Sequence, residues 1–146
     1  MRTEIRTSTR DDAAEVHRLT TQLGYQTTED GVRSRLDRFA DDDDHRVLVA
    51  TADGLVCGWI HVSLRTSVES GTWAEILGFV VDESARGRGI GRQLLQAASG
   101  WAAGRGVERM RVRSQVVREQ AHRFYEAHGF RFVKNQRVMD LELSSR

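Results

Sequence analysis

The chain has 146 residues, with 22 basic and 21 acidic side chains, so its formal net charge is only +1 at neutral pH. This length fits a single domain, residues 1–146, with its own hydrophobic core, and the charge balance predicts neither a nucleic-acid nor a membrane partner. The single cysteine, Cys57, excludes an internal disulfide and a multi-cysteine metal site. Because no apolar run reaches membrane-spanning length and the N-terminus lacks the apolar core of a signal peptide, we expect a soluble cytoplasmic protein.

The first half of the chain alternates between strand-like and helix-like patterns. Thr9 and Asp12 resemble a capping box, apolar residues then recur at helical spacing, and Gly24 ends the pattern. The dipeptide Asp53-Gly54, which strongly favours a tight hairpin, separates two β-rich runs. The predicted elements are a strand at 3–8, a helix over 9–24, a second helix around 32–39, and a hairpin over 46–64.

The second half starts with the most apolar strand, residues 72–82, which lacks clean alternation and is therefore predicted to be covered on both faces. Gly78 within it is expected to mark a bulge. The elements predicted after it are a glycine-rich loop at 85–91, a helix over 90–104, a strand at 108–114, a helix over 118–129, and an antiparallel strand pair at 130–133 and 136–143. The order β-α-α-β-β-β-α-β-α-β-β predicts an α+β fold in α/β/α layers, with a mixed sheet of six to seven strands and about four helices.

The stretch ARGRGIGRQLL, residues 85–95, combines three glycines with three arginines directly before a helix. Glycine leaves backbone N–H groups open to a ligand, and a helix start adds unpaired donors and partial positive charge. The pattern therefore indicates a phosphate site. The third glycine, Gly91, comes one residue too early for the dinucleotide fingerprint, and no P-loop Gly-Lys-Ser/Thr is present.

This stretch closely resembles the acyl-CoA loop of the GNAT superfamily of N-acetyltransferases, whose signature is Arg/Gln-x-x-Gly-x-Gly/Ala. Arg86, Gly89 and Gly91 match the three defining positions, and AHRFYEAHGF, residues 121–130, is similar to a second family block near the C-terminus. The order of the predicted elements is also that of the superfamily, so the resemblance covers essentially the whole chain. It implies the GNAT fold and acetyl-CoA as the cosubstrate.

The resemblance also implies which residues hold acetyl-CoA. The loop backbone would bind the pyrophosphate, at Arg86, Gly87, Arg88, Gly89, Ile90, Gly91 and Arg92. The pantetheine arm would add to the strand edge at Phe79, Val80 and Val81. Two positions depart from the family pattern. Glu83 replaces a common proline that would stiffen the exit of the strand, so we expect a looser loop with the same binding. Arg118 replaces an asparagine that usually contacts the pantetheine. Arg118 would instead reach a CoA phosphate or line the acceptor pocket.

Acetyl transfer to an amine needs a base, an oxyanion donor and an acid for the departing thiolate. By resemblance Tyr125 is the acid, and the alternative is a packing residue with its hydroxyl at the surface. Glu75 is the candidate base, because a regular strand would put it on the same face as Phe79, four residues later. The alternative for Glu75 is a carboxylate that reaches solvent or pairs with an arginine. The oxyanion donor is expected to be a backbone N–H near Phe79–Val81. The histidines show no zinc-ligand spacing, so we expect no metal.

These features predict an N-acetyltransferase that moves an acetyl group from acetyl-CoA to a primary amine by direct attack in a ternary complex. Cys57 lies outside both family blocks, which disfavours a covalent acetyl-cysteine intermediate. Tyr25, Glu29, Asp30 and Asp41–Asp44 would suit a small cationic acceptor, such as an aminoglycoside or a polyamine, and the equal alternative is that they lie in solvated loops. The alternatives are a protein or peptide amine as the acceptor, or an acyl-CoA-binding sensor module without turnover. The sequence leaves a homodimer open.

Overall fold

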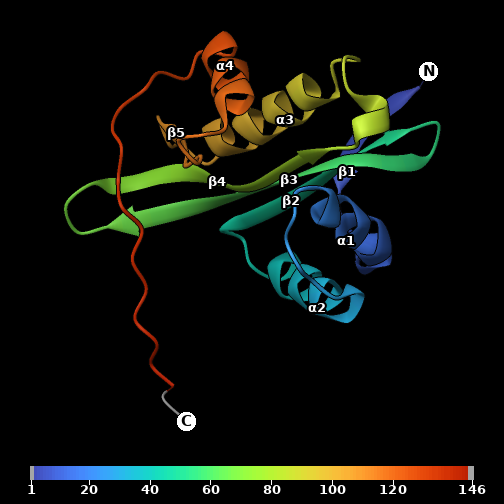
Figure 1. The fold of residues 1–146 in the computed structure, drawn as a ribbon, viewed down its shortest axis with the longest axis horizontal. Helices are drawn as coiled ribbons and strands as arrows, with labels where there is room; N and C mark the ends of the chain where they lie inside the picture. The colour runs from blue at the N-terminus through green and yellow to red at the C-terminus, as the bar shows by residue number, and fades with distance from the viewer. Residues whose placement is uncertain (1, 145–146) are drawn as a thin grey trace. The chain divides into compact units, whose positions relative to one another are not determined.

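Five strands form one mixed sheet, in the order β1-β2-β3-β4-β5, in the computed structural model, which describes residues 2–144 (Figure 1). Neighbouring strands are antiparallel except for β4 and β5, which are parallel. The strands are β1 (Thr3–Thr7), β2 (His45–Ala52), β3 (Leu55–Ser67), β4 (Gly71–Val81) and β5 (Met110–Val112). The helices are α1 (Ala13–Gln22), α2 (Glu29–Ala40), α3 (Ile90–Gly104) and α4 (Glu119–Ala127), with the 3-10 turns η1 (Arg10–Asp12) and η2 (Glu83–Ala85). The fold is therefore of the predicted α+β class.

The chain divides into two compact units, residues 1–113 and 114–146. The first unit contains the whole sheet, with α1 and α2 on one face and α3 on the opposite face (Figure 1). The second unit contains α4 and the segment that follows it. Within residues 2–144, no helix is both long enough and apolar enough to cross a membrane.

The turns and helix ends form where the sequence predicts them. Asp53 and Gly54 adopt φ values of 50° and 85°, the two positive angles that a tight hairpin turn requires, and they join β2 to β3. The Thr9 backbone N–H donates to Asp12 Oδ2 at 2.8 Å, as the predicted capping box requires. Gly24, with a φ of 90°, follows the end of α1.

Both faces of the sheet carry a buried apolar layer. Between the sheet and the pair α1 and α2, the core consists of Ala13, Val16, Leu19, Val32, Leu36, Val47, Val49, Val56 and Val80, with Trp59 packed against it. On the opposite face α3 lies close to β3, because a Cβ added to Gly58 would come within 3.1 Å of Leu94 and 3.5 Å of Ile90. Gly58 therefore makes room for α3, and burial of both layers provides most of the driving force for folding.

The last two predicted strands are not formed. No strand is assigned between residues 130 and 144, and large apolar side chains there are exposed, including Phe132 (73%), Met139 (84%) and Leu143 (91%). Alternation shows only that a segment can pair as a strand, and an isolated two-stranded hairpin is marginal in water. The connection Lys134-Asn135 is also a weak turn signal, because a type I′ turn needs positive φ at both central positions and only Asn135 readily adopts it. The observed sheet therefore has five strands, not six or seven.

Candidate active site

Strand β4 contains the bulge that Gly78 was expected to mark. Its pairing with β3 steps from Gly78 opposite His61 to Ile76 opposite Val62, so Leu77 is the extra residue. Gly78 has a steric reason to be glycine, because a Cβ there would lie 2.5 Å from the Trp59 ring. The bulge and the Trp59 ring thus meet on the face of the sheet that α1 and α2 cover.

The bulge changes which side chains share a face. Glu75 pairs with Ser63 and Phe79 pairs with Ile60, and Ser63 and Ile60 point to opposite faces of the continuous strand β3. The prediction that Glu75 and Phe79 share a face is therefore wrong, because the extra residue shifts the alternation by one. Glu75 lies on the face that carries His61, against which Phe39 of α2 packs.

Strand β4 continues well beyond its partner β5. The parallel pairing covers only Ala74, Glu75 and Ile76, whereas β4 runs on to Val81. Pairing with β5 is therefore confined to residues 74–76 of β4. The part of β4 beyond it includes the bulge and the predicted pantetheine-binding residues Phe79–Val81. An extended ligand can add to a strand edge of this kind through backbone hydrogen bonds.

The glycine-rich loop joins β4 to α3 between two buried anchors, Ala85 (5% exposed) and Ile90 (1% exposed). Gly87 and Gly89 have φ values of 80° and 77°, which other L-residues adopt only at a cost, and Gly89 is the N-cap of α3. No side chain caps this helix start and no acidic residue lies in its first turn, so its first N–H donors face an environment that suits an anion. Of the seven residues predicted to bind the pyrophosphate, residues 86–89 lie in this loop and residues 90–92 begin α3.

Glu75 is buried and held by two donors. Glu75 is only 8% exposed. Trp73 Nε1 donates to its Oε1 at 3.1 Å, and Arg113 Nε donates to its Oε2 at 3.3 Å. The alternative that Glu75 reaches solvent is therefore wrong, whereas pairing with an arginine is observed. The sequence does not reveal Trp73 or Arg113 as its partners, although Arg113 lies within the strand predicted at 108–114.

A histidine pair lies on the same face, opposite the bulge. His61 Nε2 is 2.9 Å from His45 Nδ1, and the Phe39 ring lies 4.4 and 4.5 Å from the two imidazole rings. Burial, and then the neighbouring His45, lower the pKa of His61 to about 4, so His61 is neutral at pH 7. Among residues 2–144, no group of three or more His, Cys, Asp or Glu side chains could hold a metal ion.

Tyr125 and Arg118 belong to the second unit. Tyr125 lies in α4, its ring contacts the rings of Phe124 and Phe130 at 5.5 and 5.3 Å, and Arg118 is the N-cap of the same helix. Burial raises the pKa of Tyr125, while the positive charge of Arg118 acts in the opposite direction. The hydroxyl is therefore protonated at neutral pH, as a proton donor must be. The sequence did not predict that the charge of Arg118 acts on the pKa of Tyr125.

Comparisons with known proteins agree on one family. The model of the Acetyltransferase (GNAT) family matches residues 10–130. An aminoglycoside N(6')-acetyltransferase type 1 from Stenotrophomonas maltophilia is 32% identical over 130 residues, covering 86% of this chain and 84% of that protein. An aminoalkylphosphonate N-acetyltransferase from Salmonella typhimurium is 33% identical over 142 residues, covering 90% of each.

A solved structure shares the fold. The structure of AAC(6')-Iy in complex with the bisubstrate analogue CoA-S-monomethyl-acetylneamine superposes with a TM-score of 0.82 at 22% identity, over 99% of each chain. The family match spans both compact units and includes β4, the glycine-rich loop and α4. The chain therefore belongs to the GNAT family of acetyltransferases, and it is an N-acetyltransferase.

Proposed function

We propose that the protein transfers the acetyl group of acetyl-CoA to a primary amine of a small molecule by direct attack, within a single domain that spans residues 1–146. In this reaction the amine nitrogen forms a bond to the acetyl carbon, the carbon–sulfur bond breaks, and the thiolate takes up a proton. The observation that carries the proposal is the loop after β4, where two left-handed glycines lead into an uncapped helix start. No metal and no acetyl-cysteine intermediate take part in the proposed reaction.

The loop is proposed to hold the CoA pyrophosphate. Glycine at positions 87 and 89 lets the chain turn with open space beside each Cα, since a Cβ at either position would meet no atom within 4 Å. The backbone N–H groups at the start of α3 and the side chains of Arg86, Arg88 and Arg92 would then meet the phosphates. The pantetheine arm would follow β4 at Phe79–Val81, beyond the segment that pairs with β5.

Two groups are proposed to move protons. A primary amine has a pKa near 10 and must lose a proton before it can attack, and Glu75 would take that proton, directly or through water. Its two donors, Trp73 and Arg113, hold the carboxylate in one orientation. Tyr125 would give its proton to the departing thiolate, and its raised pKa supports this role because the hydroxyl stays protonated. Arg118 is proposed to contact CoA or the acceptor.

A polycationic acceptor, such as an aminoglycoside or a polyamine, is the first candidate. The aminoglycoside-modifying relative supports it, and so does the run of carboxylates around α2. These carboxylates, however, form two groups at the two ends of a helix of 12 residues, about 18 Å apart. Several of them already pair with a cation: Glu29 and Asp30 with Arg33, and Asp44 with Arg105. A compact acceptor could therefore use only one of the two groups, and at Glu29 and Asp30 it would have to displace Arg33.

An amine that also carries an oxyanion is the second candidate, and arginines beside Glu75 favour it. Arg111 lies opposite Glu75 in the β4–β5 register, and the guanidinium groups of Arg109 and Arg111 each lie 5.6 Å from the centre of the Trp73 ring. Within residues 2–144 neither of these two arginines forms an ion pair with a carboxylate. A stacked guanidinium keeps its N–H donors available in the plane, which suits a phosphonate or carboxylate.

A thiol-release assay with a panel of amines tests the proposal and ranks the acceptors. The panel contains an aminoglycoside, a polyamine, 2-aminoethylphosphonate, its uncharged counterpart ethanolamine, and a peptide with a free amine. We expect acetyl-CoA-dependent thiol release with at least one small amine. A preference for 2-aminoethylphosphonate over ethanolamine that disappears in Arg111→Met would select the second candidate. Release with the peptide alone would favour a protein acceptor, and CoA binding without release for any amine would favour a sensor module.

A further inference from the structure

Asp82, the residue between β4 and the glycine-rich loop, connects three elements. Its backbone N–H donates to the Cys57 carbonyl of β3 at 2.8 Å, which keeps the chain attached to the sheet. Its side chain is the N-cap of η2, where Oδ1 accepts from the Ser84 N–H at 3.1 Å. The direction in which the chain leaves β4 is therefore set at this residue.

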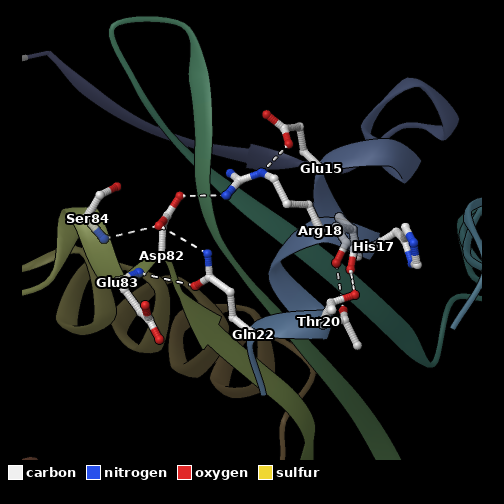
Figure 2. A network of polar contacts seen from close by, with 10 residues as sticks. Glu15, His17, Arg18, Thr20, Gln22, Asp82, Glu83 and Ser84 are labelled. Atoms are coloured by element: carbon white, nitrogen blue, oxygen red, sulfur yellow. Dashed lines mark hydrogen bonds and ion pairs between the residues drawn. The ribbon is translucent and has the colours of Figure 1, made fainter. Parts of the chain in front are cut away.

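Helix α1 reaches the same carboxylate with two side chains that lie four residues apart (Figure 2). Arg18 Nη1 lies 3.0 Å from Oδ2 of Asp82, and Gln22 Nε2 donates to Oδ1 at 3.4 Å. The Gln22 amide also accepts, through Oε1, from the Glu83 backbone N–H at 3.3 Å. Gln22 thus bridges the side chain of one loop residue and the backbone of the next.

The carboxylate of Asp82 is ionised in this arrangement. Burial on its own would raise the pKa of Asp82, but hydrogen bonds from the Ser84 N–H, Arg18 and Gln22 outweigh it and hold the pKa below its usual value. The Asp82 side chain is 13% exposed, whereas that of Arg18 is 43% exposed, so the carboxylate is the more buried partner. The contact is more than a solvated surface ion pair, because both carboxylate oxygens are used.

The residue at position 83 explains why these contacts with α1 are needed. Many GNAT proteins have proline where this chain has Glu83. For that reason we expected a looser loop after β4. Proline has no N–H, whereas the Glu83 N–H is held by Gln22. Glu83 is also the first residue of η2, the position that proline favours, and Asp82 has a φ of −54° and a ψ of 135°, which suit a residue before proline.

We propose that Asp82, Gln22 and Arg18 are positioning residues that replace this proline. They hold the chain against α1 where it leaves β4, so that the donors of residues 86–92 keep a constant position relative to β4 when acetyl-CoA binds. None of the three is proposed to touch a reacting atom. Because α1 supplies two of the three side chains, order in the loop and order in α1 depend on each other. This inference rests on the proposed role of the loop in acetyl-CoA binding.

The test removes the bridge and then restores stiffness by a different route. Gln22→Leu removes both hydrogen bonds of the Gln22 amide, one to the Asp82 carboxylate and one from the Glu83 N–H. We expect the affinity for CoA, measured by titration calorimetry, to fall about three- to tenfold, because the two bonds act on CoA only through the position of the loop. Adding Glu83→Pro to Gln22→Leu should restore most of the affinity, because proline fixes φ and leaves no N–H without a partner. Gln96→Leu is the matched control, since it makes the same substitution at an exposed position of α3, on a different helix from Gln22.

Hydrogen exchange in the absence of ligand separates this inference from the proposed function. Exchange at the Ser84 and Ala85 amides should speed up in Gln22→Leu, return towards wild type in the double variant, and stay unchanged in Gln96→Leu. Equal exchange and equal CoA affinity in Gln22→Leu and wild type would overturn the inference, and so would a double variant that behaves like Gln22→Leu. If the variants show this exchange pattern but the wild type does not bind CoA, the proposed function of the loop is overturned and the positioning role remains.

Discussion

Gly89 and Gly91 lie two residues apart at the start of α3, and substitutions at the two positions should have different consequences. Gly89 is the N-cap, with a φ of 77°, and a Cβ there would meet no atom within 4 Å. Gly91 lies inside the helix and is not among the glycines with positive φ. A side chain at Gly89 therefore costs backbone strain, whereas a side chain at Gly91 tests how closely the ligand approaches.

The expected changes follow from these conformations. Gly89→Ala should cost about 1–2 kcal/mol for the left-handed backbone, which lowers Tm by about 2–8 °C. Gly91→Ala should gain up to about 1 kcal/mol of helix stability and keep the affinity for CoA, since alanine is the other residue in the family signature at this position. Gly91→Val places a larger side chain beside the N–H donors. Loss of one charge-assisted hydrogen bond, worth about 1.5–3 kcal/mol, would weaken CoA binding about 10- to 150-fold.

Two measurements on each variant decide the outcome. Scanning calorimetry gives Tm, and titration with CoA gives the dissociation constant. Gly100→Val is the matched control, because it makes the same substitution in α3, at a position where a Cβ meets no atom within 4 Å. We expect this control to bind CoA as the wild type does. A folded Gly91→Val variant with wild-type affinity for CoA would show that the phosphates do not lie at this helix start, and the reasoning about the loop would be refuted.

Three further predictions concern side chains that titrate. Tyr125→Phe should leave the affinity for CoA and Tm nearly unchanged. It should lower turnover by about 10²–10⁴-fold, nearer the lower end, with a smaller loss at high pH. Normal turnover in this variant would mean that Tyr125 is only a packing residue. Glu75→Gln should reduce turnover most at low pH, where few amines are already free, and a loss that is uniform across pH would point to a structural role instead. His61 has a pKa of about 4 in the folded chain and about 6.5 in the unfolded chain, so its contribution to stability is complete above pH 6.5 and is lost as the pH falls to 4. Urea unfolding should show that the difference in stability between wild type and His61→Asn changes by up to about 3 kcal/mol over this range, and a constant difference would contradict the shift.

Local signals were enough to predict most of the fold. Asp53-Gly54 can form only a few tight turns, and the apolar spacing of Val32, Leu36 and Phe39 fits one face of a helix, so these elements appear where expected. The strands predicted beyond residue 130 failed because strand formation depends on a partner, and alternation carries no information about a partner.

The candidate site was predictable in its backbone and less so in its side-chain geometry. The loop at 86–92 follows from glycines and arginines that are contiguous in the sequence. The face on which Glu75 lies depends on one extra residue, Leu77, whose effect is visible only in the pairing with β3. Gly78 predicted a bulge from the sequence. Only the structure shows the Trp59 ring, which leaves no room for a side chain at this position.

The most direct test follows an isotopically labelled acetyl group from acetyl-CoA. The protein is incubated with labelled acetyl-CoA and the best amine from the panel, and mass spectrometry locates the label while free thiol is counted in parallel. We predict that the label appears on the amine nitrogen, that one thiol is released for each acetyl group transferred, and that no label remains on the protein. Tight binding of acetyl-CoA without a labelled amine, or label retained on Cys57, would contradict direct acetyl transfer.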